Sequence, residues 1–321
     1  MMKVPFASLI LAFTLCAPVM AIAGDWPDRP VHFIVPFPAG GSTDVAARVV
    51  GDHLSRTLGR QVVVENKSGA NGNIAIEYVA KSSPDGYTIL IATDAVSSNP
   101  YVYKMDIDPL KDLVPVIELS RQPIALAAHP SLGVTTLAEL TNLVKQQPGL
   151  GFATGSGAGS GQAMVGLWYA KLAGIKLEQV PYRGGGQAIN DLVAGHVKLG
   201  VLGTTPLVPY NKTGGLILLA QSMATRSPAL PNVPTFQEAG IDGLVLDQRI
   251  GMFVPAGTPA AIATRLNAEV NAALRDEKVR NIFNDQAQEP TGGTVEQYTR
   301  QVRDDSEKYQ RLVKELNVKS E

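Results

Sequence analysis

The sequence predicts an α/β protein built as two similar lobes, each an open sheet flanked by helices. Three observations support this prediction. A strand, a glycine-rich turn and a helix follow one another repeatedly along the chain, which is typical of a parallel sheet with helices on both faces. The same order starts again in the second half of the sequence. The 321 residues also exceed one average domain, since domains hold roughly 100 to 200 residues.

The first 23 residues have the pattern of a cleaved secretory signal peptide. Lys3 makes the start basic, residues 4–23 carry no charge, and the run ends in Ala21-Ile22-Ala23. The run is about long enough to span a bilayer, so an uncleaved anchor is the alternative, which Pro18 and the small end residues disfavour. Cys16, the single cysteine, would leave with the signal. We therefore expect a periplasmic protein without disulfides, held by its core.

The charge balance does not favour two classes of partner, nucleic acids and anionic membranes. Cleavage after Ala23 would leave 27 basic and 29 acidic residues, a net charge of −2. A nucleic acid or an anionic membrane surface would require a basic patch, which this composition does not favour.

The first lobe is predicted to begin with a buried strand at 31–37, followed by a turn at 38–44. Apolar residues then recur at helical spacing from Val45 to Leu58, and Gly59 ends that helix. The elements expected next are a strand at 62–64, a helix at 74–80 and a strand at 87–92.

The second lobe repeats this order after an extended segment at 113–128. Its predicted strands lie at 150–153, 177–182 and 199–202. A helix is expected at 162–173, another at 187–194, and a helix start at 203–206.

The C-terminal part differs because helices dominate it. Thr258-Pro259 is an N-cap followed by a first-turn proline, and Thr294 with Gln297 forms a capping box. The charges between 300 and 314 indicate a solvated helix face. We place these helices on lobe 1, so that lobe 1 comprises 24–124 plus 222–321 and lobe 2 comprises 125–221. The chain would cross near 120–128 and near 217–225, and two crossings would form a hinge.

Four glycine-containing loops each follow a strand and open a helix. They lie at 39–44, 155–162, 183–187 and 203–206. Ligands of open α/β sheets bind beyond the carboxyl ends of strands, where helix N-termini offer free N–H groups and partial positive charge. Any single loop could be only a turn with a cap. Four of them together favour a site for a small anion.

The loop at 155–161 alternates glycine with other residues, and no nucleotide or hydrolase motif fits it. Ser160 occupies the place of the third glycine in the dinucleotide fingerprint, and no Gly-Lys-Ser/Thr follows. The flanking glycines of an esterase elbow are also missing. A carboxylate is therefore favoured over a nucleotide.

Catalytic and metal-binding signals are weak. The four histidines are scattered without a ligand spacing, and no residue suggests itself as nucleophile or general base. We expect no enzyme activity, no metal and no cofactor.

Several segments resemble one family over nearly the whole chain, in order. They include Trp26-Pro27-Asp28-Arg29-Pro30, Ile34-Val35-Pro36-Phe37-Pro38-Ala39-Gly40-Gly41-Ser42-Thr43-Asp44, Val64-Glu65-Asn66-Lys67, Asp85-Gly86-Tyr87-Thr88, Val180-Pro181-Tyr182-Arg183-Gly184 and Pro255-Ala256-Gly257-Thr258-Pro259. The chain thus resembles the Bug (Bordetella uptake gene product) family, the periplasmic substrate-binding proteins of tripartite tricarboxylate transporters.

The resemblance implies a periplasmic-binding-protein clamshell, or Venus flytrap, that closes on a carboxylate and presents it to a permease of one large and one small membrane subunit. The family holds the proximal carboxylate largely by backbone groups and ordered waters at the loop matching 39–44 and at loops of the other lobe. The glycines at 155–161 should then be half of an anion clamp.

Two departures from the family concern specificity. Leu202 stands where an aspartate is common, so a polar contact is missing. The segment Asp247-Gln248-Arg249-Ile250-Gly251 stands where many relatives have a small residue and then an aromatic before the glycine. Its Arg249 could pair bidentately with a second carboxylate. This would suit a dicarboxylate, with aromatic, terephthalate-like compounds as one candidate. The alternative is that Arg249 pairs with Asp247 or another acid of the chain, and Arg183 could likewise brace its own loop.

The function we expect is capture of a small carboxylate by a monomer that does no chemistry. A sensor subunit for a membrane receptor and an organic-acid enzyme on the same scaffold remain alternatives. The candidate ligand-binding residues are Phe37, Ala39, Gly40, Ser42, Thr43, Ser156, Gly157, Ser160, Arg183, Gly184, Thr204 and Arg249.

Overall fold

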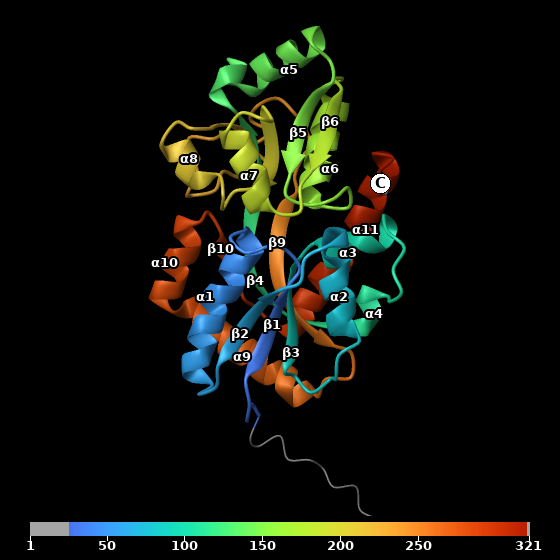
Figure 1. Ribbon diagram of the computed structural model, residues 1–321, viewed down its shortest axis with the longest axis vertical. Coiled ribbons are helices and arrows are strands. Elements are labelled where there is room, and N and C mark those ends of the chain that lie inside the picture. Colours follow the sequence, from blue (N-terminus) through green and yellow to red (C-terminus); the bar gives the residue numbers. More distant parts are fainter. Residues whose placement is uncertain (1–25, 320–321) are drawn as a thin grey trace, which may run out of the picture.

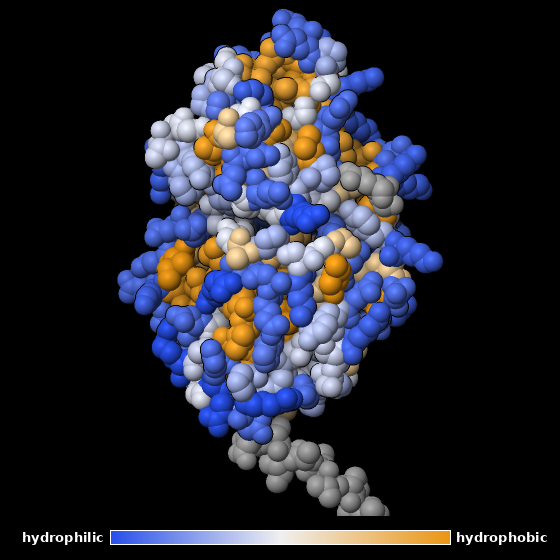
Figure 2. All heavy atoms as spheres, viewed as in Figure 1, coloured by the Kyte–Doolittle hydropathy of each residue, from blue (hydrophilic) through white to orange (hydrophobic). Residues whose placement is uncertain are grey.

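The computed structural model describes residues 26–319, which form two lobes stacked along the long axis of the molecule (Figure 1). The predicted signal peptide lies outside the described residues. None of the helices between residues 26 and 319 combines the length and the hydropathy that a membrane crossing requires. On the face shown in Figure 2, hydrophobic atoms are exposed in small separate areas on both lobes.

Lobe 1 is built on five strands in the order β2-β1-β3-β9-β4. The first three are parallel, as the alternation of strand and helix predicts, whereas β9 runs antiparallel to both β3 and β4. The strands are β1 (Val31–Val35), β2 (Val62–Asn66), β3 (Thr88–Thr93), β9 (Asp247–Pro255) and the first part of β4 (Leu113–Ala128).

Helices cover both faces of this sheet. The helices α1 (Ser42–Thr57), α9 (Ala260–Arg275) and α10 (Glu277–Asp285) pack apolar residues against one face, with Leu54 and Leu266 fully buried. The other face is covered by α2 (Asn73–Ala80), α3 (Ala95–Ser98), α4 (Pro109–Asp112) and the beginning of α11 (Val295–Glu315). The short strand β10 (Glu289–Pro290) pairs with β4.

Lobe 2 continues the same sheet in the order β4-β7-β5-β6, with β8 also paired to β4. Its strands are β5 (Leu150–Thr154), β6 (Leu177–Pro181), β7 (Leu199–Gly203) and β8 (Ile217–Gln221), and its helices are α5 (Leu137–Gln146), α6 (Gly161–Leu172), α7 (Gly185–Val193) and α8 (Val208–Lys212). The helices α5 and α6 pack on one face around Phe152, and α7 and α8 pack on the other. The predicted strand and helix alternation of lobe 2 is therefore present.

A first crossing between lobes is made by β4. This strand pairs with β9 as far as Pro123 and with β7 from Ile124 onward. The second crossing differs from the prediction of 217–225. Residues 222–246 remain with lobe 2, because Phe236, Leu244 and Leu246 are buried in its core. The chain returns only at the start of β9.

Helix α11 forms a third connection, although the sequence analysis assigns it to lobe 1 alone. Tyr298 and Val302, near its start, pack in the lobe 1 core, whereas Tyr309 and Leu312, near its end, pack in the lobe 2 core. Its capping box of Thr294 and Gln297 is present as predicted. The charged face is only partly solvated, because the side chain of Asp305 is 20% exposed and pairs with Arg249.

Candidate functional site

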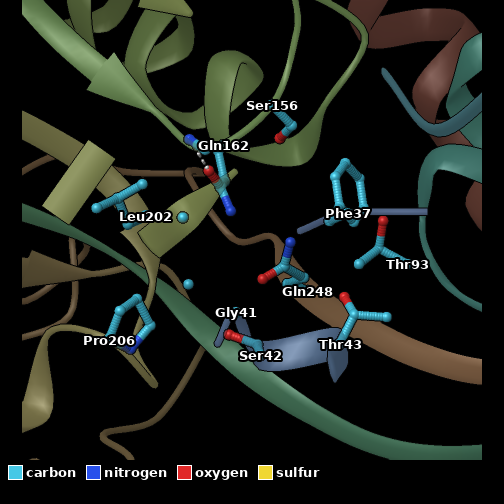
Figure 3. Close-up of a pocket in the computed structure, with 13 residues that line it drawn as sticks. Phe37, Gly41, Ser42, Thr43, Thr93, Ser156, Gln162, Leu202, Pro206 and Gln248 are labelled. Atoms are coloured by element: carbon cyan, nitrogen blue, oxygen red, sulfur yellow. Dashed lines mark hydrogen bonds between the residues drawn. The ribbon is translucent and has the colours of Figure 1, made fainter. Parts of the chain in front are cut away.

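A narrow chamber lies between the lobes, where loops at the carboxyl ends of strands face one another (Figure 3). Its volume is about 30 Å³, enough to admit a water-sized group. We call it the inner chamber. It is lined by Phe37, Gly41, Ser42, Thr43 and Thr93 from lobe 1, by Gly155, Ser156, Gln162, Gly185, Leu202, Gly203 and Pro206 from lobe 2, and by Gln248 from β9.

The lobe 1 loop before α1 is held in shape from behind. The Asp44 carboxylate accepts hydrogen bonds from the Gly40 N–H at 3.0 Å and from Arg48 Nε at 2.9 Å. Asn66 Nδ2 donates to both the Phe37 carbonyl and Asp44 Oδ1. Although burial of Asp44 acts to raise its pKa, these donors hold that pKa below its usual value. The Asp44 carboxylate therefore stabilises the loop, and Asp44 is not part of the chamber lining.

Three helices begin at the inner chamber. Ser42 is the first residue of α1, Gly185 is the first residue of α7, and Gln162 lies in the first turn of α6. First-turn N–H groups have no acceptor within their own helix, and the aligned peptide dipoles place partial positive charge there. The starts of α1 and α7 therefore bring partial positive charge to a lining that holds no cationic side chain, whereas the first N–H of α6 is already accepted by Asp94.

Two glutamine amides also face the inner chamber, from opposite sides (Figure 3). Gln162 Oε1 accepts the Gly155 N–H at 2.8 Å, and Gln248 Oε1 accepts Gln122 Nε2 at 2.8 Å. The oxygen of each amide is thus engaged by the protein. Each NH₂ group is left to serve the chamber.

The alternating glycines at 155–161 mainly connect the two lobes, which is a different role from the anion clamp that the sequence analysis expects. Three of their N–H groups donate across the cleft to lobe 1: Gly157 to Asn71 Oδ1 at 2.9 Å, Gly159 to the Tyr103 hydroxyl at 3.3 Å, and Gly161 to Asp94 Oδ2 at 3.0 Å. We call these three contacts the clasp. Only Gly155, whose N–H holds Gln162, borders the inner chamber.

Asp94 is the buried member of the clasp. Its Oδ2 also accepts the Tyr309 hydroxyl of α11 at 2.8 Å, while Oδ1 has no hydrogen-bond partner. Burial raises the pKa of Asp94, and the hydrogen bonds from Tyr309 and Gly161 oppose that shift. One side chain of lobe 1 therefore contacts both the start of α6 and the helix that spans the lobes.

A wider space, the outer chamber, continues from Phe37 and Ser156 toward the surface. Its volume is about 550 Å³, which suits a small organic molecule. It is lined by Phe37, Ser68, Gly69, Ala70, Asn71, Gly72, Ser156, Gly157, Pro181, Tyr182 and Arg183. Arg183 is exposed and is the one charged residue of this lining.

Half of the candidate residues line these chambers. Phe37, Ser42, Thr43 and Ser156 line the inner one, and Gly157 and Arg183 line the outer one. The other six lie outside both linings. Ser160 caps α6 by accepting the Ala163 N–H, and Thr204 hydrogen bonds to Gln122. Gly184 packs on Pro38, while Ala39 and Gly40 are exposed residues of the loop before α1.

Arg249 is the main correction. Its Nη1 lies 3.0 Å from both oxygens of Glu118, its Nη2 lies 2.8 Å from Asp247, and its Nε lies 3.4 Å from Asp305. The side chain is 18% exposed and is absent from both chamber linings. Three carboxylates already surround the guanidinium, so the alternative pairing with acids of the chain is the one observed. Burial raises the pKa of Asp305 to about 6.

The sequence analysis missed Thr93, Gln122, Gln162 and Gln248. Gln248 directly precedes Arg249, and successive residues of a strand point to opposite faces. Only one of Gln248 and Arg249 can therefore face the cleft, but the alternation along the strand does not indicate which one. Gln162 was visible as the residue that ends the glycine loop. Gln122 lies in a long extended segment and directly follows two other polar residues, Ser120 and Arg121, so nothing in the sequence distinguishes it.

No group of three or more His, Cys, Asp or Glu side chains within residues 26–319 is arranged to hold a metal ion. Burial and the hydrogen bond to Asp191 raise the pKa of Tyr182, in the outer chamber lining, to about 12. The other large shifts in pKa lie outside the chambers, in the tyrosines of α11 and in the cluster around Arg249.

Comparisons with known proteins agree with this architecture. The model of the family described as "Tripartite tricarboxylate transporter family receptor" (TctC) matches residues 46–318. Protein BugT of Bordetella pertussis is 33% identical over 312 residues, covering 95% of this chain and 94% of BugT.

Solved structures are similar over the whole fold. A Rhodopseudomonas palustris protein solved with adipate is 34% identical, with a TM-score of 0.89 over 92% of this chain and 99% of the other. The periplasmic binding protein BugD is 30% identical, with a TM-score of 0.87 over 92% of this chain and 100% of BugD. MatC of R. palustris, solved with malate, is 30% identical, with a TM-score of 0.84 over 90% and 100%.

Proposed function

The chain belongs to the TctC family of tripartite tricarboxylate transporter receptors, and on this premise we propose that it captures a small dicarboxylate in the periplasm and delivers it to such a transporter. The lobes close on the ligand without chemical change. The membrane partners are one large and one small subunit. A cleaved signal peptide at residues 1–23 provides export.

The observation that carries the proposal is the inner chamber. Three helix N-termini converge there, and hydroxyl and amide groups surround the same space. The described lining holds no acidic side chain that would repel an anion. Helix N-termini bind carboxylate and phosphate groups by this combination of donors and dipole.

The shape of the site favours a ligand with two carboxylates. The inner chamber has room for little more than one small group, and the rest of the molecule would extend into the outer chamber. There the exposed guanidinium of Arg183 is positioned to pair with a second carboxylate. Adipate and malate, the compounds bound by two similar proteins, are both dicarboxylates. The aromatic, terephthalate-like candidate required Arg249 in the ligand site, but Arg249 pairs with acids of the chain.

Thermal unfolding of ligand-free protein against mono-, di- and tricarboxylates tests this function. A ligand that binds only the folded state, at 100 times its Kd, adds about 2.7 kcal/mol to the free energy of unfolding, so we expect Tm to rise by about 5 °C or more with a dicarboxylate.

Arg183→Ala should weaken binding of a dicarboxylate more than binding of its monocarboxylate analogue. Arg56→Ala, also an exposed arginine but on the outer face of α1, is the matched control. If no carboxylate changes the Tm of folded, ligand-free protein, the proposal is wrong.

A further inference from the structure

We propose that Gln248 and Gln162 form a pair of fixed NH₂ donors for the carboxylate in the inner chamber, and that this pair makes the protein select carboxylates without an adjacent amino group. Gln122 acts as the positioning residue that fixes Gln248. This inference rests on the proposed function and specifies the class of ligand.

The orientation of Gln122 is set by a backbone donor. The Thr205 N–H lies 3.3 Å from Gln122 Oε1, and a backbone N–H can only donate. The oxygen end of Gln122 must therefore face Thr205. In this orientation the Thr204 hydroxyl, at 3.3 Å, can donate to the same oxygen. Gln122 is fully buried, so no water competes for its amide.

The fixed Gln122 in turn orients Gln248. With its oxygen engaged, Gln122 directs Nε2 to Gln248 Oε1 at 2.8 Å. Gln248 is 5% exposed, and its own NH₂ group is then left on the chamber side. Gly203 packs directly on this amide pair, since a Cβ there would overlap Gln248 Oε1 and lie 2.6 Å from Gln122 Nε2. The glycine therefore provides the space in which the two amides meet.

Gln162 is fixed by the same logic on the other side of the chamber. The Gly155 N–H donates to Gln162 Oε1 at 2.8 Å, which leaves the NH₂ end for the chamber. In Figure 3 the amide nitrogens of Gln162 and Gln248 both point into the space between the lobes. An isolated amide could be placed with its oxygen and nitrogen exchanged. Here the backbone N–H groups of Thr205 and Gly155 determine the orientations of Gln122 and Gln162.

A site of this kind discriminates by hydrogen-bond polarity. An ionised carboxylate only accepts hydrogen bonds, so it matches two NH₂ groups and the first-turn N–H groups of α1 and α7. An ammonium group only donates. Neither described chamber lining offers it a carboxylate, and the helix N-termini repel its charge. An amino acid would therefore leave its ammonium desolvated and unpaired.

Paired ligands test the selectivity. Succinate, glutarate and adipate are each compared by calorimetry with their 2-amino counterparts aspartate, glutamate and 2-aminoadipate. We expect the amine-free member of every pair that binds to bind at least about 10-fold more tightly. Equal affinity within the pairs would overturn this inference and leave the proposed function intact. Binding of no carboxylate would overturn both.

Two variants test whether Gln122 orients Gln248 and whether Gln248 donates to the ligand. Gln248→Glu replaces an NH₂ donor by an oxygen of nearly the same size and should weaken succinate or adipate at least about 100-fold. Gln122→Glu cannot donate to Gln248 Oε1, so Gln248 should reverse and present its oxygen to the chamber. The expected signature is a fall in the affinity ratio between succinate and its monoamide, succinamate.

The control for these variants is Gln237→Glu, on the exposed surface of lobe 2, which should bind as the original protein does. An unchanged succinate to succinamate ratio in folded Gln122→Glu would show that Gln122 does not orient the donor. An unchanged affinity in Gln248→Glu would remove Gln248 from the site.

Discussion

Gln248 and Arg249 show how strongly the role of a residue depends on the face of its strand. Both lie on β9 at the junction of the lobes. Gln248 faces the inner chamber and Arg249 faces Glu118 and Asp305. Residue chemistry alone favours the arginine as the partner of a carboxylate. In the structure that arginine pairs with buried acids, and the residue that reaches the chamber is a neutral amide.

Arg249→Ala should therefore destabilise the protein without selectively weakening a dicarboxylate. The substitution leaves Glu118 and Asp305 buried without their cation, and breaking a buried ion pair in this way costs on the order of 3 to 5 kcal/mol. Urea unfolding would measure the loss. Arg121→Ala, which breaks a half-exposed pair with Glu289, should cost less than about 1 kcal/mol.

Ligand titration of the same variant distinguishes the two roles. If the Arg249→Ala protein is stable and loses only dicarboxylate binding, Arg249 contacts the ligand and the structural role assigned to it here is wrong.

At the scale of elements, the glycine loop at 155–161 is a contact surface between the lobes. Its three clasp N–H groups meet acceptors from three separate segments of lobe 1. A Cβ on Gly159 would lie 2.9 Å from the Tyr103 ring and 3.0 Å from Asn99 Oδ1. Side chains at this position would hold the lobes apart, so glycine is needed here for close approach.

Gly159→Ala should therefore impair closure while each lobe stays folded. We expect ligand affinity to fall at least about 10-fold, because weak contacts from both lobes would no longer enclose the ligand. The Tm of the ligand-free protein should change by less than about 2 °C. Gly215→Ala, whose Cβ would have no neighbour closer than 3.6 Å, controls for the loss of a glycine. Unchanged affinity would mean that closure tolerates the extra methyl group.

Periodicity predicted most of the elements and few of the contacts between them. The extended segment expected at 113–128 is β4, and the four glycine loops do open helices. The return crossing and the double role of α11 were not predictable, because both depend on which core receives a few apolar residues such as Phe236 and Leu312. The loops also predicted the chamber at the strand ends. Which N–H groups face it depends on how the lobes meet.

At the scale of the whole molecule, β4, β9 and α11 connect the lobes, and the loops meet across the cleft. One such meeting point is Pro38 of lobe 1 against Gly184 of lobe 2. A Cβ on Gly184 would lie 3.5 Å from Pro38 Cβ, within the range for disulfides. Gly184 has an extended backbone with φ of −175°, which any residue adopts. The Pro38 ring atoms that would clash disappear when the proline itself is replaced.

The double variant Pro38→Cys and Gly184→Cys, made without Cys16, should therefore lock the lobes together when oxidised. Oxidation with bound dicarboxylate should trap the ligand through dialysis, and oxidation of ligand-free protein should abolish binding, because entry requires the lobes to separate. Reduction should restore exchange in both cases, and the reduced protein is the internal control. Free ligand exchange in protein shown to carry the disulfide would mean that the ligand enters without the lobes opening. Failure of the disulfide to form, with or without ligand, would mean that the lobes do not meet at Pro38 and Gly184 in solution.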